Sequence, residues 1–291
     1  ISNNANVIAK GGSTGSNGSY GIYSSSDYSS GSLTVNGGNL TAISSSSTWV
    51  SAGIYMRGNI NINGGTVISS GGRGNNSSYG IYSHENNITI NNSTVVATAG
   101  EITCNISNAI RVREGKSISI DLNSIVVAKA TAVNASALSI DTSGIISGSY
   151  NGKIAVIGDS SLYKVLAGSL DLTTGDHSAK TLADDGYTWD NSTNTLTLRN
   201  IVVNGQADGI ITDTFGIKTP AGTDIVLEGK NVVCAGDTTG LVSHGINTAE
   251  GSMTVSGSGE IIALGGHAGN YSYGLYSNTS TNLNGGSGIS L

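Results

Sequence analysis

Apolar residues alternate with small polar residues in short segments along the whole chain. Examples are LTVN at 33–36, NLTAIS at 39–44 and ININ at 60–63, and clusters of Gly, Ser and Asn separate such segments. Alternation with a period of two, bounded by turn-forming residues, predicts β-strands. No segment keeps an apolar period of 3.6 residues, so we expect little helix.

The tripeptide Gly-Ile-Tyr returns at residues 21–23, 53–55 and 80–82, and related tripeptides stand at 216–218, 245–247 and 274–276. Sequence periods of about 20–50 residues are typical of solenoids. Three strands in each turn of about 28 residues predict an all-β fold, a parallel β-helix in which each strand pairs with its equivalent one turn away. The crossover rule makes a right-handed coil the expected hand.

The alternation also predicts which side chains stack inside. Leu33 and Val35 share one face, and we expect them to stack on the pairs Ile60 and Ile62, Ile88 and Ile90, Ile118 and Ile120, and Leu138 and Ile140. The position after each pair is a corner, occupied by Asn36, Asn63, Asn91, Asp121 and Asp141. Asn and Asp tolerate left-handed backbone angles, so this series predicts a ladder of polar side chains along a sharp turn.

Residues 153–194 interrupt the repeat. We interpret residues 1–152 as later turns of one β-helix, and 153–291 as a cap followed by a second β-helix that is incomplete at its C-terminal end. The segment 187–198 predicts a strand, a polar turn and a return strand, with Trp189 covering an open solenoid end. Because the chain begins and stops inside repeats, we expect the native protein to continue past at least one end.

Charge is scarce, at 11% of residues, and the net charge is −6 with 13 basic residues. No basic cluster is present, so nucleic acid is not an expected partner. No apolar run approaches the roughly 18 residues that cross a bilayer, and no signal peptide opens the chain, so direct membrane insertion is not expected either. Cys234 aligns with a small-residue series, which favours a buried side chain over a disulfide with Cys104; the series is Ala9, Ala42, Ser69, Ala97 and Ala263.

The repeats of GIY, LTVNGG and NLTA, with the segment GYTWD…TLTL, resemble a carbohydrate-binding β-helix family found in surface proteins of clostridia and related gut bacteria. That family is similar to pectate lyases in fold. The resemblance implies non-catalytic binding of plant cell-wall polysaccharide, often with bound calcium, by a protein that is secreted or held at the bacterial cell surface. It assigns no binding residue.

Tyr23, Tyr55 and Tyr82 each follow an inward-facing Ile, so alternation turns all three outward in one column. Aromatic faces stack on the apolar faces of sugar rings, which predicts a polysaccharide platform. In the alternative interpretation, the column only stabilises neighbouring strands by cross-strand contact. The second series has Lys218 and Asn247 before Tyr276, which weakens the case for a matching platform there.

Aspartates supply the candidate metal ligands. Asp121 and Asp141 occupy equivalent predicted corners, and a second, looser group follows residue 205: Asp208, Asp213 and Asp224. Calcium would relieve repulsion between neighbouring carboxylates, although it needs six to eight oxygen ligands. Capping of turns is the other role for the same side chains.

Catalysis is not expected. A polysaccharide lyase of this fold would need a basic residue, and Arg111, Arg113 and Lys116, beside Glu114, are the densest charged group in the first half. A solvated strand edge explains that group more simply. The four histidines, including His84 and His244, are dispersed in predicted exposed turns without zinc spacing. The leading hypothesis is therefore polysaccharide binding without cleavage; a structural stalk or adhesin spacer and a lyase are the alternatives.

Overall fold

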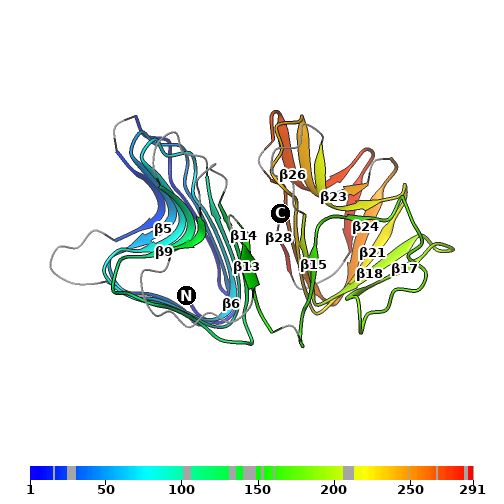
Figure 1. The fold of residues 1–291 in the computed structure, drawn as a ribbon, viewed down its shortest axis with the longest axis horizontal. Coiled ribbons are helices and arrows are strands. Elements are labelled where there is room, and N and C mark those ends of the chain that lie inside the picture. Colours follow the sequence, from blue (N-terminus) through cyan, green and yellow to red (C-terminus); the bar gives the residue numbers. More distant parts are fainter. Residues whose placement is uncertain are drawn as a thin grey trace. The chain divides into compact units, whose positions relative to one another are not determined.

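The computed structural model describes residues 1–15, 17–24, 31–100, 106–130, 136–139, 149–151, 154–159, 161–205, 213–248, 250–266, 268–284 and 288–290. These residues form β-strands and turns without helix, in a β-solenoid of about 8 turns whose parallel strands lie about 29 residues apart (Figure 1). The predicted parallel β-helix is confirmed. Within the described ranges, no helix is long and apolar enough to span a bilayer.

The chain divides into two compact units, Ile1–Asp159 and Ser160–Leu291. The sequence-based boundary lay after residue 152. The first unit extends further because β13 (Ser149–Asn151) and β14 (Ile154–Ile157) turn back on it: β14 pairs antiparallel with β11 (Ile125–Ala130) and with β13.

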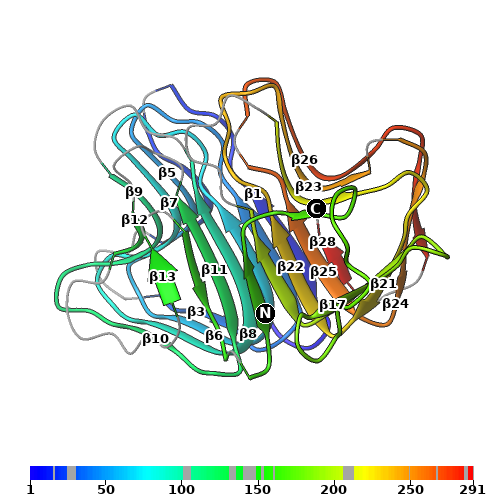
Figure 2. The ribbon, with the colours of Figure 1, turned by 45° about the vertical axis from the view of Figure 1, so that its right-hand side comes forward.

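Two sheets build the first unit. The larger sheet covers two faces, because β6 (Ile60–Ser70) and β8 (Ile88–Ala99) run through a corner. Figure 2 shows β6, β8 and β11 side by side. The parallel strands of this sheet are β1 (Asn6–Lys10), β3 (Leu33–Val35), β4 (Asn39–Ile43), β6, β8, β10 (Ile118–Ile120) and β11. The third face is a five-stranded parallel sheet of β2 (Ser19–Tyr23), β5 (Val50–Met56), β7 (Ser77–Ser83), β9 (Ile106–Val112) and β12 (Ser136–Ser139).

The described strands of the second unit form three sheets. The first contains β15 (Lys164–Ala167), β19 (Ile201–Asn204), β22 (Lys230–Cys234), β25 (Glu260–Leu264) and β28 (Gly288–Ser290). The second contains β16 (Leu170–Asp171), β20 (Thr214–Thr219), β23 (Val242–Thr248) and β26 (Tyr271–Ser277). The third contains β17 (Tyr187–Asp190), β18 (Thr195–Arg199), β21 (Asp224–Glu228), β24 (Met253–Gly257) and β27 (Thr281–Asn284).

The predicted hairpin at 187–198 is confirmed, since β17 and β18 pair antiparallel and place Trp189 opposite Leu196. Trp189 is buried in the core of the second unit. The strands β15 and β16 already pair with β19 and β20. The second solenoid therefore begins before the hairpin, inside the segment where the sequence shows no repeat.

Aliphatic side chains stack inside the first unit as the alternation predicts. Leu33 pairs with Ile60, Ile60 with Ile88, and Ile88 with Ile118, and the three isoleucines are fully buried. Leu138 is an exception. It pairs with Ile110 of β9, a full turn earlier, and so belongs to the third face instead of stacking on Ile118. Its expected partner Ile140 lies outside the described residues.

The predicted corner ladder is present. Asn63 Nδ2 donates to Asn36 Oδ1 at 3.2 Å, and Asn91 Nδ2 donates to Asn63 Oδ1 at 3.1 Å. Gly64, which follows Asn63, has a φ of 98°, and Asn92 follows Asn91 with a φ of 46°. Because few residues other than Gly and Asn adopt such angles readily, the NGG and NNS sequences define where the chain turns.

Cys234 is buried, as expected for a small side chain, but its predicted alignment is wrong by one position. It pairs with Leu264, whereas Val233 pairs with Ala263. Cys104 lies outside the described residues.

A candidate carbohydrate-binding face

The outer surface of the sheet β12-β9-β7-β5-β2 carries a group of aromatic side chains, here called the aromatic face. Tyr23 pairs with Tyr55, and Tyr55 pairs with Tyr82, so the predicted column exists. Their ring centroids are 5.5 and 5.1 Å apart. The three rings do not share one environment: the exposed fraction is 53% for Tyr23 on the edge strand but 6% for Tyr82, which neighbouring rings cover.

A second aromatic column, which the sequence analysis missed, lies beside the first. Tyr20 stacks on Tyr23 with centroids 4.4 Å apart and an interplanar angle of 19°, and Tyr79 lies 4.6 Å from Tyr82. The signal was the longer motif SYGIY at 19–23 and 78–82, which places a tyrosine before the glycine as well as after the isoleucine.

The glycine between the two columns explains why both face outward. A Cβ atom on Gly53 would lie 2.7 Å from both Ala42 O and Ser70 N, and one on Gly80 would lie 2.8 Å from Thr98 N. The backbone of this sheet therefore passes against the opposite sheet at the glycine, and Figure 1 shows β5 and β9 bending towards the solenoid interior. As a result, the residue before the glycine and the residue after the isoleucine, such as Tyr79 and Tyr82, lie on the same outer side of the sheet.

Arg111 occupies the next position in the tyrosine column, paired with Tyr82. Its guanidinium carbon lies 5.4 Å from the ring centroid of Tyr82 and 5.5 Å from that of Tyr79, and Nη1 donates to the Tyr79 hydroxyl at 3.1 Å. The interpretation of Arg111 as a solvated edge charge is therefore wrong, since the cation packs on aromatic rings. Arg113 and Glu114 are exposed, and Lys116 is half-buried.

Burial raises the pKa of three tyrosines on this face. It raises the pKa of Tyr20 and that of Tyr82 to about 12, and it also raises the pKa of Tyr55. Burial and the nearby Arg113 lower the pKa of His84, whose ring lies 5.6 Å from that of Tyr82. At neutral pH the face presents uncharged rings and hydroxyl groups with the Arg111 cation beside them.

The equivalent sheet of the second unit, β16-β20-β23-β26, also has an aromatic outer surface. His244 pairs with Tyr273 in the column before the glycine, and its ring stacks on Tyr276 at 4.4 Å with an interplanar angle of 9°. Phe215 precedes His244 in the same column. The expectation that His244 lies in an exposed turn is wrong, because it sits in β23 with an exposed fraction of 3%.

Two of the candidate metal ligands, Asp121 and Asp213, accept hydrogen bonds from backbone amides. Both carboxylate oxygens of Asp121 lie 3.0 Å from the backbone nitrogen of Asn92, and Asp213 Oδ1 accepts from Val242 N at 3.0 Å. Asp224 is exposed, while Asp141 and Asp208 lie outside the described residues. Among the described residues, no group of three His, Cys, Asp or Glu side chains is placed to hold a metal ion. Calcium binding stays a prediction, which isothermal titration with calcium tests.

Comparisons with protein-family models, with curated proteins and with solved structures found no match. The resemblance stated from the repeats therefore depends on their motifs alone.

Proposed function

We propose that this chain binds extracellular polysaccharide without cleaving it, through the aromatic face of the first unit. The observation that carries the proposal is the continuous contact between the rings of Tyr20, Tyr23 and Tyr55, with centroids between 4.4 and 5.5 Å apart. Tyr23 is exposed and the other two are half-buried, so ring surface and hydroxyl groups are both accessible. Such surfaces stack on sugar rings and hydrogen-bond their hydroxyls.

A binding role fits the charges beside these rings. Glu85 interacts with Arg57 Nη1 at 3.6 Å and with His84 Nδ1 at 3.6 Å. A glycosidase would need two carboxylates that converge on one glycosidic bond, and Glu85 instead interacts with two basic side chains. We expect the protein to act outside the cell or at the bacterial cell surface, where polysaccharide is the ligand.

Affinity electrophoresis through gels containing pectin, cellulose or mucin glycans tests the proposal. We expect retarded migration on at least one glycan, and weaker retardation when Tyr20 and Tyr23 are both changed to Ala. Tyr163→Ala, which removes a half-buried tyrosine outside the face, is the control and should migrate like the unaltered protein. Unretarded migration on every glycan would contradict the proposal.

A structural stalk is the second candidate, because the rings also support one another. Tyr55 and Tyr82 meet edge to face at 88°, a geometry that stabilises aromatic pairs by about 0.5–1.5 kcal/mol. The exposed Tyr23 separates the two functions. Tyr23→Ala should weaken glycan retardation if the face binds sugar, and should change only stability if the column is structural. Tyr82→Ala is unsuitable, because removing a buried aromatic side chain costs about 3–5 kcal/mol.

A further inference from the structure

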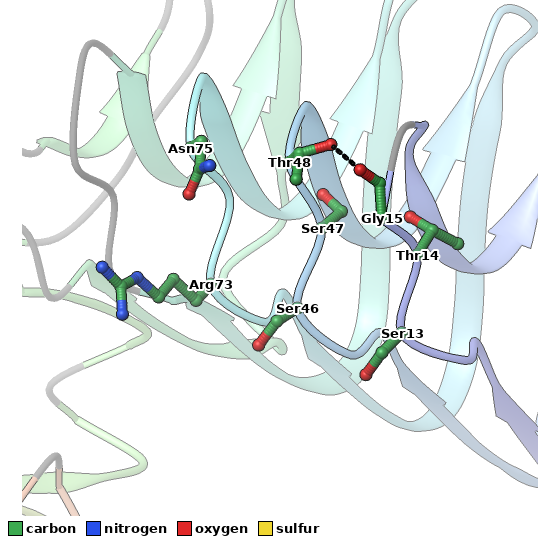
Figure 3. Close-up of a pocket in the computed structure, with 8 residues that line it drawn as sticks. All are labelled: Ser13, Thr14, Gly15, Ser46, Ser47, Thr48, Arg73 and Asn75. Carbon is green, nitrogen blue, oxygen red and sulfur yellow. Dashed lines mark hydrogen bonds between the residues drawn. The ribbon is translucent and has the colours of Figure 1, made fainter.

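Three loops of successive turns in the first unit, each leading into a strand of the aromatic face, form a hollow lined by polar residues and Gly15. These loops connect β1 to β2, β4 to β5 and β6 to β7, and the hollow has a volume of about 590 Å³. Its walls are made by Ser13, Thr14, Gly15, Ser46, Ser47, Thr48, Arg73 and Asn75 (Figure 3). Small-molecule sites typically have volumes of about 300–1,000 Å³.

The loops stack in register, so their side chains form rows. Isolated parallel β-bridges pair the backbone of Thr14 with that of Ser47, and the backbone of Ser47 with that of Gly74. Figure 3 shows Ser13 and Ser46 pointing in the same direction from adjacent loops, with Arg73 following in the third. Ser47 N donates to Arg73 O at 2.8 Å, and Asn75 N donates to Ser47 O at 3.2 Å, so backbone hydrogen bonds hold the frame.

Two polar groups in this frame have unused hydrogen-bonding capacity. Ser47 has an exposed fraction of 6%, and its Oγ has no hydrogen-bond partner. Arg73 is exposed and pairs with no described carboxylate. By contrast, Thr14 Oγ1 and Thr48 Oγ1 donate to loop carbonyls at 2.6 and 3.1 Å. The exposed guanidinium of Arg73 is therefore available to donate to a ligand, whereas the Ser47 hydroxyl lies beneath the surface of the hollow.

Charge identifies the chemical class of that ligand. Arg73 is the only charged residue in the segments 11–18, 44–49 and 71–76. A guanidinium forms bidentate hydrogen bonds with planar or tetrahedral oxyanions, and no carboxylate in these segments opposes one. The hydroxyl and amide groups around it suit a sugar, and Trp49, with an exposed fraction of 59%, directly follows Thr48.

We propose that the hollow binds an oxyanion group, a carboxylate or a sulfate ester, carried by an acidic saccharide. Arg73 holds the anion, while the exposed hydroxyl groups of Ser13 and Ser46 on the neighbouring loops contact the sugar. No tyrosine of the aromatic face lines the hollow, so this site does not require the aromatic face to bind a glycan.

Calorimetric titration with three tetrasaccharides tests this proposal: hyaluronan, which carries carboxylates only; κ-carrageenan, which carries sulfate esters only; and neutral cellotetraose. All titrations use the full chain carrying Tyr20→Ala and Tyr23→Ala, so binding at the aromatic face does not contribute. We expect at least one acidic tetrasaccharide to bind, with the responding one identifying the anion, and cellotetraose to bind at least tenfold more weakly. Quenching of Trp49 fluorescence should follow the same titration, since Trp189 is buried.

Adding Arg73→Gln should weaken binding about tenfold, the effect of losing one charge-assisted contact. Ser46→Ala should weaken it about threefold without lowering the melting temperature, because the Ser46 side chain is exposed in the free protein. Lys116→Gln removes one positive charge at another corner and should leave affinity unchanged. Equal affinity for cellotetraose, no binding of either acidic glycan, or unchanged affinity in Arg73→Gln would each overturn the proposal, without bearing on the aromatic face.

Discussion

The guanidinium of Arg111 lies 5.4 Å from the ring centroid of Tyr82, its partner in the register between β9 and β7. A cation thus occupies the column position that tyrosine holds in three preceding turns. Arg111 covers the end of the aromatic face at which Tyr82 is buried, and it leaves Tyr23 accessible at the opposite end. The same column therefore has a packed part and an open part.

Replacing Arg111 by Met tests the packed part. We expect a loss of about 1 kcal/mol in the free energy of unfolding, because the cation–π contact disappears while an apolar chain of similar length remains. Urea unfolding measures this change. Arg113→Met, at an exposed position on the same side of the chain, should stay within about 0.5 kcal/mol of the unaltered protein. Equal effects of the two substitutions would contradict the packing role.

We predict that the glycine of the Gly-Ile-Tyr repeat is required for close packing of its strand against the backbone of the opposite sheet. Gly53→Ala should destabilise the protein by about 1–3 kcal/mol, because its Cβ would meet backbone atoms of Ala42 and Ser70 at 2.7 Å. Gly12→Ala is the matched control, since a Cβ there meets nothing within 4 Å. Thermal unfolding of both variants checks the difference, and a loss confined to Gly12→Ala would contradict the assignment.

Buried serines at one corner link successive turns. Ser78 Oγ donates to Gly72 O at 2.9 Å and accepts from Gly100 N at 2.8 Å. Ser78→Ala should therefore cost about 1–3 kcal/mol, since it removes this partner from the half-buried Gly100 amide and the Gly72 carbonyl. Ser47→Ala, which removes a buried hydroxyl that has no partner, should cost nothing or stabilise slightly. Chemical unfolding of the two variants distinguishes these outcomes.

Alternation and turn chemistry in the sequence predicted most of this fold. The stack of Ile60, Ile88 and Ile118 and the ladder of Asn36, Asn63 and Asn91 both follow from residues whose roles are local. The position of Leu138 was not predictable in the same way. The alternation in a strand of four residues is compatible with either of two faces of the solenoid. Only the pairing of Leu138 with Ile110, one full turn earlier, shows which face this strand belongs to.

The site was predictable in part, for a physical reason. Alternation placed Tyr23, Tyr55 and Tyr82 on the outer side, but the burial of Tyr82 depends on contacts with Tyr79 and Arg111, which come from other turns and another column. Strict alternation would also turn the residue three positions before Tyr82 inward. The bend at Gly80 restores it to the outer side, and that bend arises from backbone packing between sheets.

Alkaline titration should reveal the buried tyrosines. Burial raises the pKa of Tyr20 and Tyr82 to about 12, from 10.0 in an unfolded chain. Their neutral state therefore stabilises the fold fully below pH 10, and this contribution is lost as the pH rises from about 10 to 12, because only the unfolded chain releases the protons there. Ultraviolet absorbance of tyrosinate should show a late phase near pH 12. Tyr82→Phe should reduce that phase, and an unchanged phase would contradict the assignment to Tyr82.

His244 is expected to limit stability in mild acid. Burial lowers its pKa, with Asp213 acting in the opposite direction, and the rings of Tyr273 and Tyr276 pack against it. As the pH falls, His244 becomes protonated in the unfolded chain before it does so in the folded protein. The stability that neutral His244 contributes is therefore present above pH 6.5 and is lost as the pH falls through the lower folded pKa. Both ring nitrogens lack hydrogen-bond partners, so His244→Phe should keep the stacking on Tyr276 and raise stability by about 1–3 kcal/mol at pH 8. Melting temperatures of the two proteins between pH 8 and 5 should diverge further below pH 6.5. His84 is present in both proteins, so its protonation does not change the difference between their melting temperatures. A difference that stays constant or narrows below pH 6.5 would mean that His244 is not the group whose protonation destabilises this sheet.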